Sequence, residues 1–243
     1  MDEDGKLHPT LVIDATRNFF KRIKHFAAEK APQALFFHHA SGMAGITACR
    51  SFADAFVGGE NMYQGALVRK GSYIGVFDQD YFSTAFSGEK WGYPIYFIPQ
   101  QLRAALMFRP QNAELWKKTP LAAPQRRSMR HIIGCFLVHG TSVWVRDQAV
   151  AEIQQPVHDL MLKTFGTLQG VQFVSQQSGN QPFKVKSDSR ELRSGAYVKG
   201  NKCLVVLFND TDRETGCSLL WNKEQKNLKV PPRDFVLEVF EIL

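Results

Sequence analysis

The predicted secondary structure changes character near residue 170, and this change constrains the fold more than any other feature of the sequence. Before it, helix-like segments such as 11–30 alternate with short apolar runs such as 93–100, an alternation typical of a parallel α/β sheet. After it, short strand-like runs are divided by Gly, Asn, Asp and Pro, which is typical of an antiparallel sandwich. The sequence therefore predicts an α/β domain over residues 1–168 and a small all-β domain over residues 169–243.

The length of the first domain limits its architecture. A complete (β/α)8 barrel needs about 250 residues, so residues 1–168 have room for about three or four of its units. We therefore predict a fold of the α/β plus all-β class: the C-terminal part of a (β/α)8 TIM barrel, incomplete, followed by a small antiparallel β-sandwich. An unclosed barrel exposes strand edges and apolar surface. We accordingly expect the missing half-barrel on an upstream segment or on another chain.

The beginning of the chain, MDEDGKLHPT, is acidic and polar and is no secretory signal. It resembles a loop from the middle of a domain. The sequence thus predicts a cytoplasmic protein if this start is genuine, and a secreted or periplasmic one if the chain is truncated. No apolar run reaches the roughly 18 residues of a membrane span, so we expect no membrane partner.

Charge and cysteine content exclude further classes of function. The formal net charge is +7, but the basic residues are scattered and form no long block, so we expect no nucleic-acid partner. The four cysteines include no CxxC pair, so zinc-ligand spacing is absent and we predict no metal and no cofactor. The cysteines are typical of core thiols, although a disulfide such as Cys203 with Cys217 stays open.

A first group of candidate site residues follows the apolar run at 35–37. Polar side chains at the carboxyl end of a parallel strand face the usual active-site rim of a barrel. His38, His39 and Ser41 are therefore candidates for contacts with substrate hydroxyls. The alternative is a strand end whose histidines bond to nearby backbone. No third ligand with suitable spacing supports a metal site.

The stretch CRSFADAFVGGEN, residues 49–61, places one acid inside an apolar run and another after a double glycine. Asp54 and Glu60 could divide acid and nucleophile work in glycoside hydrolysis if they lie about 5–10 Å apart. Six extended residues span up to about 20 Å, so the pair converges only if the double glycine turns the chain back. The alternatives are two residues that bind sugar hydroxyls, or a buried Asp bonded to backbone amides and an exposed Glu.

Aromatic side chains in the expected loops are candidates for stacking on a sugar ring. Trp91, within GEKWGYP, is the strongest of these, although such rings more often pack loops onto a core. Serine-hydrolase chemistry is not indicated, because the sequence contains no GxSxG elbow.

The order of these segments resembles a known family. LFFHHAS, then Phe52-Ala53-Asp54 followed by Gly59-Glu60, then WGYPIYFIPQ, LVHGTSVW and VPPRDFVLEVFEI are similar to the C-terminal barrel half and trailing sandwich of glycoside hydrolase family 123 and its uncharacterised relatives. The resemblance covers most of the chain, although each motif is short. It implies a TIM-barrel glycosidase that acts on oligosaccharides or glycoconjugates.

The resemblance also implies a catalytic apparatus that this sequence lacks. In such enzymes the substrate's own N-acetyl group is the nucleophile, and an adjacent Asp-Glu pair on an earlier barrel strand does the acid and orienting work. The only comparable run here, DED at 2–4, follows no strand. We therefore expect a glycoside hydrolase-like fragment that hydrolyses or formerly hydrolysed O-glycosidic bonds and lacks the main catalytic acids. Asp54, Glu60 and Asn61 would then line the site, and the alternative is a non-catalytic carbohydrate-binding or scaffold protein.

Overall fold

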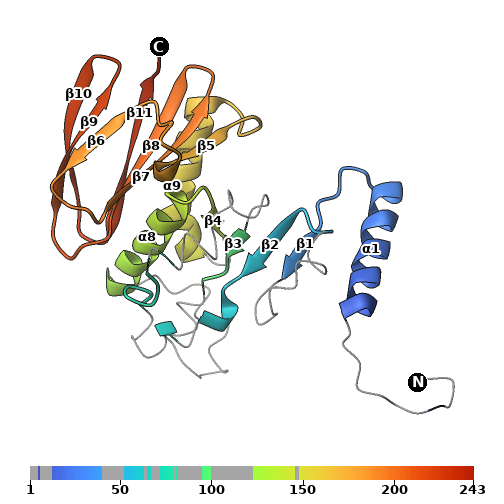
Figure 1. Cartoon of the computed structure of the whole chain (residues 1–243). Helices are drawn as coiled ribbons and strands as arrows, with labels where there is room; N and C mark the ends of the chain where they lie inside the picture. The colour runs from blue at the N-terminus through green and yellow to red at the C-terminus, as the bar shows by residue number, and fades with distance from the viewer. Residues whose placement is uncertain are drawn as a thin grey trace.

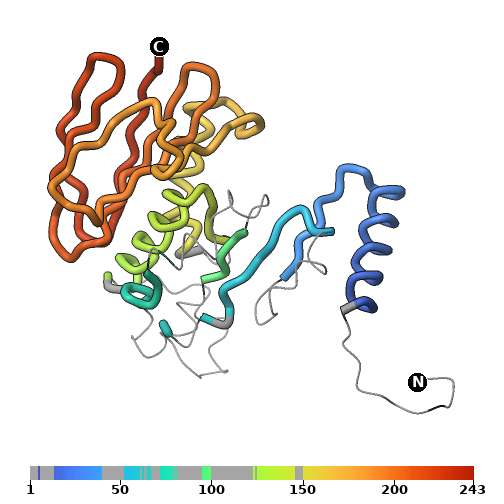
Figure 2. Tube along the Cα trace, viewed as in Figure 1, coloured from blue at the N-terminus to red at the C-terminus, as the bar shows by residue number. Residues whose placement is uncertain are grey.

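The computed structural model (Figures 1 and 2) gives the arrangement of the chain in two parts, one mixed α/β and one all-β. It describes the following residues: 5, 13–39, 52–62, 65–66, 72–78, 80, 95–99, 123–145 and 148–243.

The first part contains a parallel sheet with strand order β1-β2-β3-β4. Its strands are short, and they are β1 (Phe37–His39), β2 (Ala55–Gly58), β3 (Ile95–Phe97) and β4 (Ser142–Val143). Each strand pairs in parallel with the next, as the alternation of helix and strand predicts. The helical elements of this part are α1 (Ile13–Lys30), the 3-10 turn η1 (Glu60–Met62), α8 (Ala123–Leu137) and α9 (Gln148–Phe165).

The two faces of the parallel sheet differ. One face packs against helices, because the ring of His38 lies 4.4 Å from that of Phe20 on α1 and the ring of Phe97 stacks 5.2 Å from that of Phe136 on α8. Side chains alternate along a strand, so Phe37 and His39 lie on the opposite face of β1. The prediction of a parallel α/β sheet is confirmed.

The second part consists of two antiparallel sheets, with strand orders β10-β9-β6 and β11-β8-β7-β5. We call them the C-terminal sheets. Their elements are β5 (Gln172–Ser175), η3 (Gln176–Ser178), β6 (Lys184–Ser187), β7 (Leu192–Lys199), β8 (Lys202–Asn209), β9 (Thr215–Trp221), β10 (Glu224–Val230) and β11 (Asp234–Glu241). The prediction of antiparallel strands after about residue 170 is confirmed. The side chains between the sheets form one core, to which Leu207 of β8 and Leu219 of β9 both belong.

Strand β8 joins the two parts because it is buried on both faces. Alternate residues such as Val205 and Leu207 enter the core between the C-terminal sheets, while Val206 and Phe208 enter the core that contains α8. The approach of α8 is close: a Cβ atom at Gly134 would lie 2.6 Å from the ring of Phe208.

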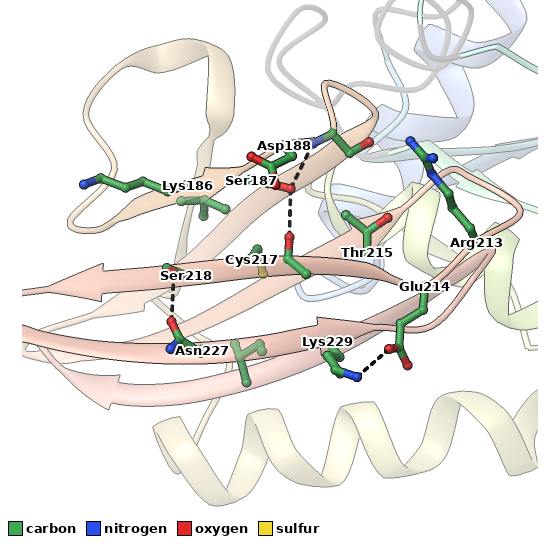
Figure 3. A pocket seen from close by; sticks show the side chains of 14 residues that line it. Lys186, Ser187, Asp188, Arg213, Glu214, Thr215, Cys217, Ser218, Asn227 and Lys229 are labelled. Atoms are coloured by element: carbon green, nitrogen blue, oxygen red, sulfur yellow. Dashed lines mark hydrogen bonds and ion pairs between the residues drawn. The ribbon is translucent and has the colours of Figure 1, made fainter.

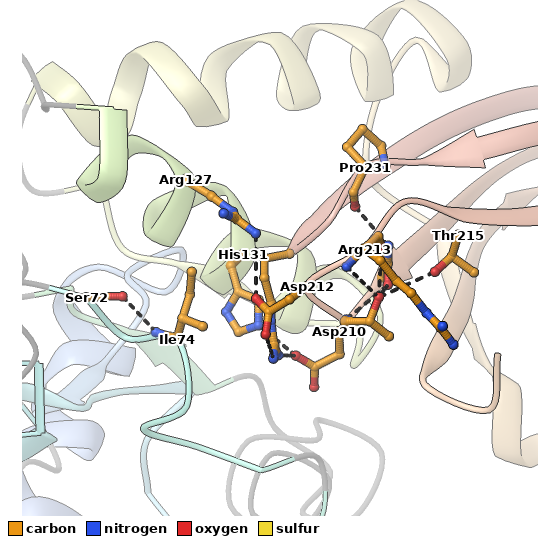
Figure 4. A network of polar contacts seen from close by, with 12 residues as sticks. Ser72, Ile74, Arg127, His131, Asp210, Asp212, Arg213, Thr215 and Pro231 are labelled. Atoms are coloured by element: carbon orange, nitrogen blue, oxygen red, sulfur yellow. Dashed lines mark hydrogen bonds and ion pairs between the residues drawn. The ribbon is translucent and has the colours of Figure 1, made fainter.

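A network of charged side chains lies beside this apolar junction (Figure 4). His131 of α8 is 3% exposed, and its Nε2 lies 2.9 Å from Asp210 Oδ1. The guanidinium of Arg233 donates to the same Asp210 oxygen at 2.5 Å and to both carboxylate oxygens of Asp212. Arg130 donates from Nε to both carboxylate oxygens of Asp234 at 2.8 Å. Helix α8 is thus held to the C-terminal sheets by charge as well as by packing.

The possible disulfide between Cys203 and Cys217 does not form. Both residues are buried and free. Cys203 and Cys217 lie in the core between the C-terminal sheets. Burial raises the pKa of the Cys203 thiol to about 12, and burial also raises the pKa of Cys217.

These two thiols are expected to resist alkylation while the chain is folded. A thiolate is the reactive form of cysteine, and little thiolate exists at neutral pH when the pKa is raised by burial. Iodoacetamide labelling followed by peptide mass spectrometry measures the reaction at each site. Cys203 and Cys217 should be labelled fully in urea and hardly at all in buffer. Rapid labelling of either in buffer would contradict the packing described here.

Candidate functional site

The carboxyl edge of the parallel sheet brings together two residues that the sequence predicts as site residues. His39 is the last residue of β1, and Glu60 begins η1 just after β2. His39 Nε2 lies 3.2 Å from Glu60 Oε2, and the two side chains are 50% and 36% exposed. An imidazole and a carboxylate at this distance can bind sugar hydroxyls and can pass a proton to or from a bound molecule. This pair is the centre of the candidate site.

Gly59 sets the position of Glu60. It has a φ of +100°, which side chains rarely permit, and a Cβ atom there would lie 2.3 Å from the ring of Phe97. Because Gly59 has no side chain, the backbone can pass close to the ring of Phe97 and turn directly from β2 into η1. The second residue of the double glycine must therefore be glycine, because of its backbone angle and because a side chain there would have no space.

Asp54 lies at the other end of β2, where it joins α1 to the sheet. Lys24 Nζ of α1 donates to Asp54 Oδ2, and the backbone N–H of Phe36 donates to the same oxygen at 2.7 Å. These bonds, that from Lys24 foremost, hold the pKa of Asp54 below its ordinary value. The contacts therefore stabilise the fold above the ordinary pKa of an aspartate, and this contribution is lost as the pH falls through the lowered pKa.

The hypothesis that Asp54 and Glu60 form a catalytic pair is thus not supported by their positions. The extended strand β2 separates them, and at about 3.3 Å per residue it carries the chain about 15 Å or more from one to the other. Gly59 turns the chain after β2 but does not return it to the amino end. Asp54 accepts from a backbone amide, as the structural alternative expects, but its side chain is a third exposed rather than buried and Lys24 is its second partner.

His38 and His39 have different roles because neighbouring side chains on a strand point to opposite faces. His38 is 7% exposed and lies between the rings of Phe20 and Phe56. Its position does not support the predicted contact with substrate. Of the two histidines, His39 is therefore the one placed to meet a ligand.

Two further predicted residues, Ser41 and Trp91, lie outside the described residues. Asn61 follows Glu60 in η1, and its side chain is likewise outside the description.

Three aromatic rings that the sequence did not single out lie on the same face as His39. Phe37 lies 5.7 Å from Trp144 and 6.2 Å from Tyr96, and Tyr96 lies 6.3 Å from Trp144, measured between ring centroids. Phe37 and Trp144 are each more than a third exposed. We call these three residues the aromatic cluster. The only signal in the sequence is the two-residue spacing of Phe37 and His39, since the other two rings come from distant strands.

The aromatic cluster and the His39–Glu60 pair together have the chemistry of a sugar site. An exposed ring can cover the apolar face of a pyranose, while a carboxylate and an imidazole bind its hydroxyls. Within the described part of the chain, His, Cys, Asp and Glu side chains form no group of three or more that could hold a metal ion. In the same part, no helix has the length and apolar character needed to cross a bilayer.

Comparison with known proteins gives weak similarities of structure. No protein-family model matches the sequence, and no curated protein sequence matches it. Solved structures similar to the chain include the maltogenic α-amylase AmyB from Thermotoga neapolitana, with a TM-score of 0.48 and 10% identity over 98% of this chain. A maltogenic amylase from S. marinus has a TM-score of 0.48 and 11% identity over 90% of this chain. The chain spans 60% and 33% of the lengths of these two proteins.

TM-scores below 0.5 at such low identity carry no argument about activity or substrate, since one fold can serve many functions. The resemblance to glycoside hydrolase family 123 is not shown by them either.

Proposed function

We propose that this chain is a glycoside hydrolase-like protein that binds an oligosaccharide at the carboxyl edge of its parallel sheet. The observation that carries the proposal is the His39–Glu60 pair, 3.2 Å apart, with His39 on the same face of the sheet as the aromatic cluster, in which Phe37 and Trp144 are each more than a third exposed. In this proposal the parallel sheet is the C-terminal part of a TIM barrel, and the C-terminal sheets are its trailing β-sandwich.

Within this site Glu60 is the candidate proton donor and His39 is its positioning partner. Glycosidic hydrolysis passes through an oxocarbenium-like transition state and commonly uses two carboxyl groups. We do not propose Asp54 for the second, because it lies just before β2 whereas Glu60 follows the other end of that strand. A second carboxyl group, or a nucleophile carried by the substrate, would have to come from elsewhere.

The position of Asp54 favours a second candidate function, a non-catalytic carbohydrate-binding or scaffold protein. Such a protein would keep the aromatic cluster and the hydroxyl-binding pair without the full acid–base apparatus. We further propose that another segment or another chain continues the parallel sheet beyond β1, which has a neighbour on one side only among the described strands, so that the aromatic cluster stays open to a sugar.

Hydrolysis of a panel of aryl glycosides, including N-acetylhexosaminides, tests the proposal. Glu60→Gln keeps the size of the side chain and removes its acid, and we expect it to lower kcat/KM by about 100-fold or more. Asp54→Asn is the matched control, which we expect to reduce stability while leaving kcat/KM of the folded fraction nearly unchanged.

The outcomes separate the two candidate functions. Full activity of Glu60→Gln would overturn the catalytic role of Glu60. If the unmodified chain shows no turnover, binding of the same sugars measured by calorimetry decides between the candidates. Binding that is lost in His39→Ala and Glu60→Gln would support the carbohydrate-binding protein, and no binding at all would refute both.

A further inference from the structure

We propose that the outer face of the sheet β10-β9-β6 is a binding site for an extended anionic oligosaccharide, of the sulfated or uronate kind. This site is separate from the His39–Glu60 pair, and the proposal holds whether or not the chain is a glycosidase. The face carries a shallow cleft of about 1200 Å³ (Figure 3). This volume exceeds the range of about 300–1,000 Å³ that is usual for small-molecule pockets, and it suits a ligand of several sugar units.

Strand register determines which side chains form the floor of the cleft. Lys186 of β6, Ser218 of β9 and Asn227 of β10 pair across the three strands and therefore lie in one row. Their neighbours Cys217 and Leu219 belong to the core beneath the sheet, and Cys217 also borders the cleft. Ser218 Oγ donates to Asn227 Oδ1 at 2.7 Å. The floor is thus a flat row of an amine, a hydroxyl and an amide, all groups that bind sugar hydroxyls.

Three basic and two acidic side chains line the cleft, so it carries a small excess of positive charge. Lys186 and Arg213 both line it and make no ion pair within the described part of the chain. Lys229 contributes a third cation, which pairs with Glu214 at 3.0 Å while both side chains are more than half exposed. Exposed pairs of this kind contribute about 0–1 kcal/mol, so an incoming anion can compete for Lys229. Asp188, exposed on the turn after β6, is the other acid beside the cleft.

The absence of rings narrows the class of ligand. The residues that line the cleft include no Phe, Tyr, Trp or His. Single-stranded nucleic acids are bound largely by stacking of bases on such rings, so this face lacks the feature that they require. A neutral sugar would also lack a ring for its apolar face. An anionic sugar instead gains charge-assisted hydrogen bonds from Lys186 and Arg213, which are stronger than neutral ones.

Calorimetric titration with four probes tests the proposal: a heparin-derived hexasaccharide, a hexagalacturonate, maltohexaose and a short oligothymidylate. We expect binding of at least one of the two anionic sugars, with an affinity that falls as salt is raised. Binding of heparin fragment alone would assign sulfate as the recognised group, and binding of hexagalacturonate alone would assign carboxylate. No binding of either sugar would overturn the proposal, as would equal affinity for maltohexaose.

A pair of double variants distinguishes this cleft from general attraction to a basic protein. Lys186→Gln with Arg213→Gln should weaken anionic sugar binding about tenfold or more, the loss expected for two charge-assisted contacts. Lys163→Gln with Lys202→Gln removes the same charge from exposed positions outside the cleft and should change the affinity by less than about twofold. Equal loss in both double variants would overturn the proposal. Tight binding of oligothymidylate that is lost only in the first variant would also overturn it, because the face would then be a nucleic-acid surface.

Discussion

Replacing Gly59 by alanine is expected to lower the free energy of unfolding by about 3 kcal/mol. An L side chain at a φ of +100° costs on the order of 1–3 kcal/mol, and forcing a methyl group into a filled core costs a similar amount. The new Cβ would lie 2.3 Å from Phe97, whose side chain is fully buried and has no room to move. The turn must therefore shift, and Glu60 would move away from His39. Chemical unfolding in urea measures the stability, and sugar binding measures the site.

Gly216→Ala is the control for this prediction. Gly216 lies on an exposed face of β9, a Cβ there would meet nothing within 4 Å, and its φ is not in the positive range. We expect its free energy of unfolding to stay within about 0.5 kcal/mol of the parent value. If Gly59→Ala were as stable as Gly216→Ala, the described turn between β2 and η1 would be wrong.

Replacing Asp210 by alanine is expected to cost about 3 kcal/mol of stability. Asp210 accepts a hydrogen bond from Arg233 and contacts the buried ring of His131. Its removal would therefore leave the guanidinium of Arg233 and the imidazole of His131 each without one of its polar contacts. Breaking a buried pair by removing one partner costs about 3–5 kcal/mol, and we take the lower end because Asp210 and Arg233 keep some exposure. Arg233 also has a φ of +53°, a strained conformation that these contacts help to hold. Urea unfolding followed by circular dichroism measures the change.

Asp212→Ala is the matched control, because it removes the same charge from the same network. The Asp212 side chain is 77% exposed and its bonds to Arg233 are open to solvent, so we expect a loss of about 1 kcal/mol or less. Equal effects of the two variants would show that the network contributes only general surface charge. A large effect confined to Asp210 would confirm that α8 is fixed to the C-terminal sheets through His131 and Arg233.

The kinds of residue in the candidate site can be predicted from the sequence, whereas their arrangement in space is predicted less well. His39 and Glu60 were both expected at strand ends, and the structure brings them together. Asp54 was grouped with Glu60 because the two are close in sequence. The distance between two residues of an extended strand grows with the number of residues between them, so Asp54 and Glu60 lie at opposite ends of β2. His38 and His39 are both predicted as site residues because they end a strand, but side chains alternate along a strand, so His38 lies on the helix-covered face.

The aromatic cluster could not be predicted from local sequence. Phe37 belongs to β1 and Tyr96 to β3, and Trp144 directly follows β4. The sequence around each ring does not indicate that the other two lie beside it. They meet because β1, β2, β3 and β4 pair in that order with a fixed register, which places Tyr96 opposite both Val57 and Ser142. Pairing between strands is decided by the whole core and by turn geometry rather than by single segments.

The sequence alone determined the features that depend on local periodicity. The helical spacing of residues 11–30 predicts the helix that the structure places at Ile13–Lys30. The change near residue 170 correctly separated parallel from antiparallel pairing. Tertiary structure alone decided which strand ends meet, which acid faces His39, and how β8 and α8 join the two parts. The physical reason is that periodicity acts over a few residues, whereas strand order, register and close packing depend on contacts between segments far apart in the chain.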